Sequence, residues 1–143
     1  MTENKEPKTL EFKWEYGDRE LAIQVSTYMA NNGLYIGLAS KDEEFGIFEP
    51  FSDLTTNVGG GCKPNEAFIV IEGGLLNMTE FIKQHGLGEM TEEYRNSGFN
   101  LYQKVVFDME KLRELDSEGV ENHLKIHNNK MEVNPKANVN RGR

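Results

Sequence analysis

The sequence predicts an α+β fold, in which an antiparallel β-sheet of about five to seven strands is joined by two helices in the C-terminal half and a disordered C-terminal tail. Three observations predict it. The first half alternates apolar and polar residues with a period of two, which is typical of half-buried strands. The second half contains two segments with helix caps and helical apolar spacing. The last residues are rich in asparagine and poor in the apolar groups that build a core.

Alternating or continuous apolar segments predict up to seven strands, of which the first four form an antiparallel meander. Gly17-Asp18 and Asn31-Asn32-Gly33 are expected to form the first two turns, because these residues tolerate turn conformations. Pro50 is expected to end the fourth strand. The continuous apolar run at 67–71 is expected to be a central strand buried on both faces. The predicted strands are residues 10–16, 21–26, 34–38, 45–49, 54–58, 67–71 and 99–107.

Two helices are predicted in the second half. Asn77 stands at capping-box spacing before a glutamate, and Gly86 is positioned to end this first helix. Asp108 is expected to cap the second helix, which continues through Leu124. The polar segment 89–97 is expected to be a loop. We therefore expect residues 1–7 to be a flexible N-terminus, residues 8–124 a single domain, and residues 125–143 a disordered, basic and Asn-rich tail.

Length and composition exclude several classes of protein. The 143 residues fit one domain, with 37% hydrophobic and 28% charged residues and a mean hydropathy of -0.63. No apolar run approaches the roughly 20 residues that span a membrane, and the first residues lack the order of a secretion signal. The single cysteine, Cys62, cannot form an internal disulfide. We expect a cytoplasmic protein that does not engage membranes.

Residues 59–64 (GGGCKP) resemble a phosphate-binding loop only in part. In such a loop a hydroxyl residue follows the lysine, but here Pro64 takes that position and has no amide hydrogen to donate. The preceding glycines also lack the required spacing. We interpret this segment as a flexible connector between two strands, and we expect no nucleotide cofactor.

The cysteine and the histidines offer two further candidate sites. Cys62 with His85, His123 or His127 as a base would form a cysteine nucleophile, but an incidental free thiol is favoured because no protease signature surrounds it. His123 and His127 are four residues apart, a spacing found in metal sites. The residues between them lack the glutamate of a zinc-protease helix, which favours surface histidines. We predict no enzymatic activity, no metal site and no cofactor.

The charge distribution points to a binding function. The chain carries a net charge of -8, but residues 125–143 hold five basic residues against Glu132 alone, a net +4, which leaves -12 on residues 1–124. Such a body repels nucleic acid and attracts basic surfaces. Two hypotheses stay open: a solvated acidic rim, and carboxylates that imitate a nucleic-acid backbone. The candidate binding residues are Asp42, Glu43, Glu44, Glu49, Asp53, Glu89, Glu92 and Glu93.

Direct nucleic-acid binding by the body is disfavoured. Trp14, Tyr16, Tyr28 and Tyr35 would supply a stacking face, but no cationic belt accompanies them, and core packing explains these aromatic residues more simply. Only the basic tail is suited to non-specific contacts with phosphates.

Several short segments resemble an uncharacterised family of small bacterial proteins. The resemblance spans residues 9–115 and rests on residues 49–57 (EPFSDLTTN), 65–69 (NEAFI), 80–82 (EFI) with 86–88 (GLG), and 106–112 (VFDMEKL). Members of that family are encoded on conjugative elements, plasmids and phages of Firmicutes and other gut bacteria. The resemblance brings no catalytic residues with it, and residues 59–63 are longer here than the family pattern. It implies an accessory role in a mobile genetic element, including interference with host defence.

Two function hypotheses follow. The first is a non-catalytic acidic binding protein of a mobile element that inhibits a host nucleic-acid defence enzyme, as an anti-CRISPR or antirestriction protein, by nucleic-acid mimicry. Its partner is then a basic nucleic-acid-binding enzyme. The alternative is an accessory regulatory module of a conjugative element that binds a protein through an apolar or edge-strand surface.

Overall fold

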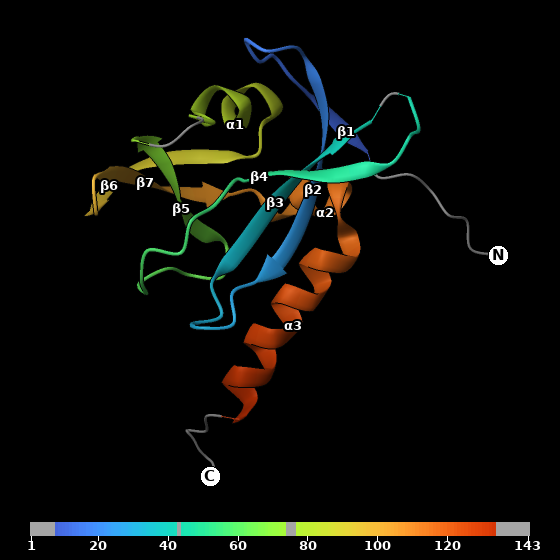
Figure 1. Cartoon of the computed structure of the whole chain (residues 1–143). Helices are drawn as coiled ribbons and strands as arrows, with labels where there is room; N and C mark the ends of the chain where they lie inside the picture. The colour runs from blue at the N-terminus through green and yellow to red at the C-terminus, as the bar shows by residue number, and fades with distance from the viewer. Residues whose placement is uncertain (1–7, 43, 74–76, 134–143) are drawn as a thin grey trace, which may run out of the picture.

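The computed structural model describes residues 8–42, 44–73 and 77–133, which form two antiparallel sheets and three helices (Figure 1). Sheet A has the strand order β1-β2-β3-β4, and sheet B has the order β5-β7-β6. This confirms the predicted α+β fold. The elements are β1 (Thr9–Phe12), β2 (Arg19–Thr27), β3 (Leu34–Lys41), β4 (Phe48–Asp53), β5 (Glu66–Glu72), α1 (Thr79–His85), β6 (Gly88–Ser97), β7 (Asn100–Phe107), α2 (Met109–Leu115) and α3 (Ser117–Val133).

Sheet A is the predicted meander. Asn32 adopts a positive φ of 61° in the turn between β2 and β3, as its residue type allows. The prediction that Pro50 ends the fourth strand was wrong, because Pro50 lies inside β4 and faces Ala39 of β3. β4 is an edge strand, and its register against β3 shifts between Leu38 and Ala39, so a residue without an amide hydrogen is tolerated there.

Sheet B departs from the sequence prediction at three points. The apolar run at 67–71 lies in β5, which is an edge strand, whereas β7 is central. Residues 89–97 are not a loop but most of β6, which pairs with β7 despite its polar sequence. Of the strand predicted at 54–58, only an isolated bridge between Thr56 and Phe68 forms among the described residues.

One hydrophobic core joins the two sheets and the helices. Alternate residues of β2 and β3 point into it, and so do alternate residues of β5 and β7. The helices contribute apolar residues from one face each. The largest fully buried apolar side chains are Phe68, Phe107, Leu21, Ile23, Leu34, Ile36, Leu54, Ile69, Ile82, Leu87 and Leu112.

The predicted caps place the helices with one correction. The N-cap position of α1 is Met78, not Asn77 as the capping-box spacing predicted; Asn77 lies one residue earlier, and its side chain accepts a hydrogen bond from the amide of Thr79 at 2.9 Å. Gly86 ends α1 with φ at 64°, as predicted. Asp108 caps α2 by accepting from the amides of Glu110 and Lys111. None of the helices among the described residues is long and apolar enough to cross a membrane.

The C-terminal helix differs from its prediction in two ways. The predicted single helix is divided at Asp116, whose φ of -153° is incompatible with a helix, and α3 starts at Ser117. α3 runs to Val133, so the predicted tail boundary at residue 125 was too early. Residues 1–7 and 134–143 of the predicted terminal segments lie outside the described residues.

The junction of α2 and α3 covers one edge of sheet A. β1 pairs with β2 up to Ala22, and further along β2 the amide of Val25 donates to the carboxylate of Asp116 at 2.9 Å. Gly119 allows this approach, because a Cβ there would overlap the carbonyl oxygen of Val25. α3 therefore closes the edge of β2 (Figure 1).

Candidate functional site

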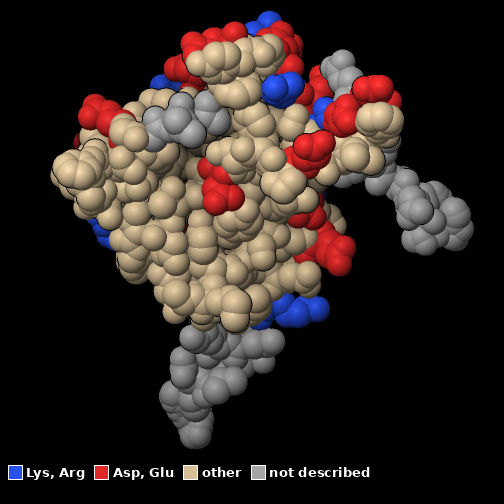
Figure 2. Space-filling model, in the orientation of Figure 1, with Lys and Arg blue, Asp and Glu red and all other residues tan. Residues whose placement is uncertain are grey.

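A groove of about 570 Å³ lies at the end of sheet A where β2 begins, β3 ends and β4 begins. We call it the acidic groove, because four carboxylates and two cations line it. Its lining residues are Asp18, Arg19, Glu20, Ser40, Lys41, Asp42, Glu49, Pro50 and Phe51. Figure 2 shows Asp and Glu gathered toward the upper and right-hand parts of this view, over the hairpins of sheet A.

The carboxylates of the acidic groove are open to a ligand. Asp18 and Glu49 are exposed, and within the described residues none of the four acids forms an ion pair. Glu20 accepts a hydrogen bond from Thr9 Oγ1 at 2.5 Å, and Asp42 accepts one from the amide of Glu44 at 2.9 Å. Each of these carboxylates therefore keeps an oxygen for a further donor.

The β3–β4 hairpin beside the groove carries exposed apolar side chains. Phe45 is 71% exposed and Ile47 is 55% exposed, next to the exposed Glu44. Asp42 holds the turn, because its carbonyl accepts the amide of Gly46 at 2.7 Å. Glu43 lies outside the described residues. A partner that reached the acidic groove would find apolar area on this hairpin as well.

An aromatic cluster supports the groove from one side. The ring of Trp14 lies 5.2 Å from that of Phe51 and 4.9 Å from that of Tyr16, close to perpendicular to each. The guanidinium of Arg19 lies over Trp14 at 5.5 Å from its ring centre. Phe51 both lines the groove and packs against the core, so it connects the two, and Trp14 packs against Phe51 from outside the groove lining.

The eight predicted binding residues do not form one site. Asp42, Glu44 and Glu49 come together at the acidic groove and its hairpin. Asp53 lies at the other end of β4 and accepts a hydrogen bond from Tyr35 Oη at 2.7 Å. Burial and Asp53 together raise the pKa of Tyr35 to about 12, so this bond persists at neutral pH.

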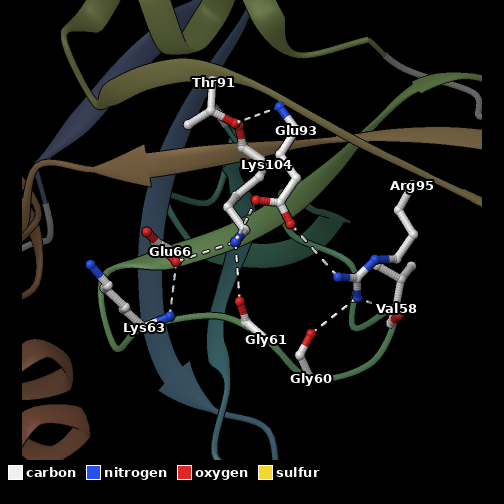
Figure 3. Close-up of polar contacts among 9 residues, drawn as sticks. All are labelled: Val58, Gly60, Gly61, Lys63, Glu66, Thr91, Glu93, Arg95 and Lys104. Atoms are coloured by element: carbon white, nitrogen blue, oxygen red, sulfur yellow. Dashed lines mark hydrogen bonds and ion pairs between the residues drawn. The ribbon is translucent and has the colours of Figure 1, made fainter.

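The predicted acids of β6 belong to sheet B. Glu89 and Glu92 are exposed on this edge strand. Glu93 lies in a bulge between Met90 and Tyr94 and is turned toward Lys104 of β7, whose Nζ it contacts at 3.0 Å (Figure 3). The carboxylate of Glu93 thus already forms an ion pair within the protein.

Lys104 and Arg95 fasten the glycine-rich loop to sheet B (Figure 3). Lys104 Nζ donates to the carbonyl of Gly61 at 3.1 Å and forms an ion pair with Glu66 at 3.4 Å. Arg95 donates to the carbonyls of Val58 and Gly60, each at 3.1 Å. The loop is therefore held in place and is not the flexible connector that we predicted. Its carbonyls face cations, whereas a phosphate cradle presents amide hydrogens.

Phe68 explains why these cations lie here. It is almost fully buried on the outer face of sheet B, beneath the guanidinium of Arg95 at 4.5 Å from its ring centre. Lys104 Nζ lies 5.7 Å from the same ring. The loop and the two cations together cover an apolar side chain that the core does not reach.

Cys62 stands in this loop at a pocket of about 60 Å³, too small for a substrate of ordinary size. Burial raises the pKa of its thiol, although Lys104 and Arg95 oppose this effect. The neutral thiol, a poor nucleophile, is thus favoured. Among the described residues, no group of three or more His, Cys, Asp or Glu side chains is arranged to hold a metal ion.

The prediction of surface histidines was wrong for His123. Its side chain is fully buried, with Nδ1 at 2.7 Å from Thr27 Oγ1 and Nε2 at 2.9 Å from the carbonyl oxygen of Pro64. His127 Nε2 lies 2.7 Å from the carbonyl oxygen of Asn32. The two imidazoles thus fasten α3 to β2 and to the loops on both sides.

Sequence reasoning missed Asp18 and Glu20 of the acidic groove. They flank the first residue of β2, whereas Asp42 follows the last residue of β3 and Glu49 is the second residue of β4. In an antiparallel meander the start of one strand lies beside the end of the next, so the predicted strand order was the signal that could have joined these acids.

Comparison with known proteins identifies a family. The model of a domain of unknown function, DUF4313, matches residues 22–126, most of both sheets and all of α1 and α2. The match supports the predicted membership in an uncharacterised family. No curated protein and no solved structure matches the chain.

Proposed function

Since the chain belongs to the DUF4313 family, we propose a function from its surface: it is a non-catalytic acidic protein that binds a basic nucleic-acid enzyme. In the finer form of this proposal it is encoded on a mobile genetic element and inhibits a host defence enzyme, as an anti-CRISPR or antirestriction protein. The acidic groove then occupies the surface that nucleic acid would use.

The observation that carries the proposal is the grouping of carboxylates on a rigid sheet. Asp18, Glu20, Asp42 and Glu49 come from three neighbouring strand ends, which fixes their spacing. Fixed charges release counterions from a basic surface as nucleic acid does, without the entropy cost of ordering a flexible acidic segment. The exposed Phe45 adds apolar contact area at the rim.

The environments of Cys62 and the histidines favour binding over catalysis. The raised pKa of the Cys62 thiol works against a thiolate nucleophile. His85, His123 and His127 form hydrogen bonds with groups that hold the fold together, namely the carbonyls of Glu11, Pro64 and Asn32.

The test is inhibition of DNA cleavage. The full-length protein is titrated into cleavage assays of a CRISPR effector complex and of a restriction endonuclease, at about 50 and about 200 mM salt. We expect inhibition of at least one enzyme that weakens at the higher salt and is relieved by added non-cleavable duplex. Inhibition that persists at high salt, or no inhibition of either enzyme, would contradict mimicry.

Charge variants locate the surface. A quadruple variant (Asp18→Asn, Glu20→Gln, Asp42→Asn, Glu49→Gln) is expected to weaken inhibition by about tenfold or more. A matched control neutralises four exposed acids elsewhere (Glu72→Gln, Glu110→Gln, Glu114→Gln, Glu118→Gln). A separate pair, Glu89→Gln and Glu92→Gln, measures the contribution of β6. Equal losses in the two quadruple variants, with about half that loss in the pair, would show that only net charge matters.

A second candidate function rests on the β6–β7 hairpin. Phe99 at its tip is fully exposed, and Tyr94 on the edge strand β6 is 53% exposed. Such a surface suits an accessory module that binds a protein through apolar and edge-strand contacts. Replacing Phe99 with Ser would then abolish association, whereas the quadruple charge variant would retain it.

A further inference from the structure

The end of sheet A opposite the acidic groove carries a surface built from uncharged segments. The turn between β2 and β3 (28–33) lies beside the loop after β4 (54–62), because the side-chain amides of Asn31 and Asn57 donate to one another at 3.0 and 3.3 Å. Neither segment contains Asp, Glu, Lys, Arg or His. We call this surface the neutral face. Figure 2 shows tan atoms over the turn, in the lower part of the view, away from the gathered Asp and Glu.

The neutral face has both a projection and a hollow. Met29 in the turn is 97% exposed, although methionine is a residue type that is mostly buried. Beside it, the turn and the loop flank the pocket of about 60 Å³ that Cys62 lines. Glu66 is the charged residue among those that line it, and its carboxylate is paired with Lys104 at 3.4 Å. The hollow has room for several non-hydrogen atoms, which is the size of a side-chain end.

Both walls of the hollow are held by the fold before any molecule binds. The carbonyl oxygen of Asn32 in the turn lies 2.7 Å from Nε2 of His127 on α3. The loop is fastened to sheet B by Arg95 and Lys104, which donate to its carbonyls. A surface that is already ordered loses little conformational entropy when it associates.

Charge and shape together indicate which molecule fits this surface. Two copies of a chain with a net charge of -8 repel one another, and this repulsion is smallest where they meet through uncharged segments. Depletion of charge, together with exposed methionine and aromatic residues, is typical of the centre of an interface between proteins. A projection beside a hollow on one face is complementary to itself when a two-fold axis relates two copies.

We propose that the neutral face joins two copies of this chain into a dimer, in which Met29 of each copy enters the hollow of the other. The inference goes beyond the proposed function and does not depend on it. β2 runs along sheet A from the acidic groove to the neutral face, so the dimer presents its two acidic grooves at opposite ends. Such a dimer is suited to bind two sites at once.

The test is the mass of the full-length protein in solution, measured by sedimentation velocity over a range of concentrations. We expect a monomer–dimer equilibrium in which the mass rises from 16.3 kDa toward twice that value, with a dissociation constant of about 1 to 100 μM. Raising the salt from about 50 to about 200 mM is expected to strengthen the dimer or leave it unchanged, because salt screens the repulsion between two acidic bodies.

Two results of this measurement would overturn the inference. One is a monomer at every concentration up to about 0.5 mM, and the other is a dimer that weakens as salt is added, since charged contacts would then hold it together. Either result leaves the proposed function standing, because charge-driven inhibition of DNA cleavage requires only the acidic groove of one copy.

Two variants that add the same charge locate the interface. Met29→Glu replaces the projecting side chain with a carboxylate and is expected to raise the dissociation constant by about tenfold or more. Gln84→Glu is the matched control on α1, at an exposed position away from the neutral face, and is expected to change it by less than about twofold. Circular dichroism checks that both variants fold. Equal losses in the two variants would overturn the assignment to the neutral face.

A complementary pair of variants tests the insertion itself. Gly60 lines the hollow, and a Cβ at this position would meet open space, so Gly60→Asp adds a carboxylate without a steric conflict. Met29→Lys and Gly60→Asp are each expected to weaken the association of identical copies. A mixture of the two proteins is expected to form a mixed dimer, because the ammonium of one enters the acidic hollow of the other. A mixture that associates no better than either protein alone would overturn the insertion of Met29.

Discussion

Lys104 is the residue on which the outer face of sheet B depends. Its side chain is 9% exposed, and its Nζ contacts Glu66, Glu93 and the carbonyl of Gly61. The hydrogen bond to Glu93 raises the pKa of Lys104, although burial opposes it, so the side chain stays charged. A buried cation with this many acceptors is stabilising only while all of them are present.

Replacing Lys104 with Met is expected to lower the free energy of unfolding by about 2 to 3 kcal/mol. Glu66 then loses its cation in a poorly solvated site, whereas Glu93, which is half exposed, keeps only its longer contact with Arg95 at 3.8 Å. Denaturant unfolding measures the change. Lys111→Met is the control, since its ion pair with Glu114 at 3.8 Å is more exposed, and it is expected to cost less than about 1 kcal/mol. Similar losses in both variants would refute the special role of Lys104.

His123 makes the stability of the protein depend on pH. Burial lowers its pKa below the usual 6.5, the carbonyl of Pro64 opposes this, and the neighbouring His127 adds to it. The imidazole of His123 therefore binds a proton more readily in the unfolded chain than in the folded protein. The contribution of His123 is fully present above about pH 6.5 and is lost as the pH falls from there toward the folded-state pKa.

We expect the free energy of unfolding to fall by up to about 1.4 kcal/mol per pH unit in this window, and His123→Gln to flatten the slope. Denaturant titrations at several pH values measure both. Glu66 acts at lower pH: burial raises its pKa, but the amide of Lys63 and the ammonium of Lys104 outweigh this and hold it below 4.5. If the wild-type protein and His123→Gln showed equal slopes above pH 4.5, this pH dependence could not be assigned to His123.

At the scale of the elements, period-two alternation and caps predicted most of the fold. β2, β3, α1 and α2 lie close to their predicted positions, because local pattern and burial agree there. β6 was missed because an exposed edge strand needs no apolar face, and only its pairing with β7 makes it a strand. The early helix end at residue 124 was wrong because His123 and His127, read as surface groups, hold α3 to sheet A.

Gly119 tests how closely α3 must approach β2. In a helix, alanine is more stable than glycine by up to about 1 kcal/mol. A Cβ at this position, however, would overlap the carbonyl of Val25 and the carboxylate of Asp116. We expect Gly119→Ala to lower the melting temperature, with a net cost of about 1 to 2 kcal/mol. Asn122→Ala, at an exposed position of α3, is the control and is expected to be neutral or slightly stabilising. A stabilised Gly119→Ala protein would show that the helix can move away freely.

At the scale of the whole molecule, the sequence predicted an acidic body but not where its acids meet. Glu49 and Asp53 lie at opposite ends of one strand, where the first lines the acidic groove and the second accepts a hydrogen bond from Tyr35. Glu93 is close in sequence to Glu92, but a bulge turns it toward Lys104. Separating the acids that line the groove from those that hold the fold together required the register of the strands, which composition does not contain.

The shared core predicts a single unfolding transition. Residues of both sheets and all three helices pack together in one cluster. We expect circular dichroism and Trp14 fluorescence to follow the same denaturation curve. Leu112→Ala, a fully buried site on α2, should shift both curves equally, by about 2 to 4 kcal/mol. Two separate transitions, or a shift in only one signal, would show that the sheets unfold independently.

The closing of the β2 edge by the α2–α3 junction has a consequence for synthesis in the cell. All four strands of sheet A emerge from the ribosome well before residues 109–133, which form the helices. During that interval the amide of Val25 lacks its hydrogen bond to Asp116, and this edge of β2 is open to pairing with another extended peptide. We therefore expect a chain truncated before residue 109 to leave this edge of β2 unpaired and to associate with copies of itself.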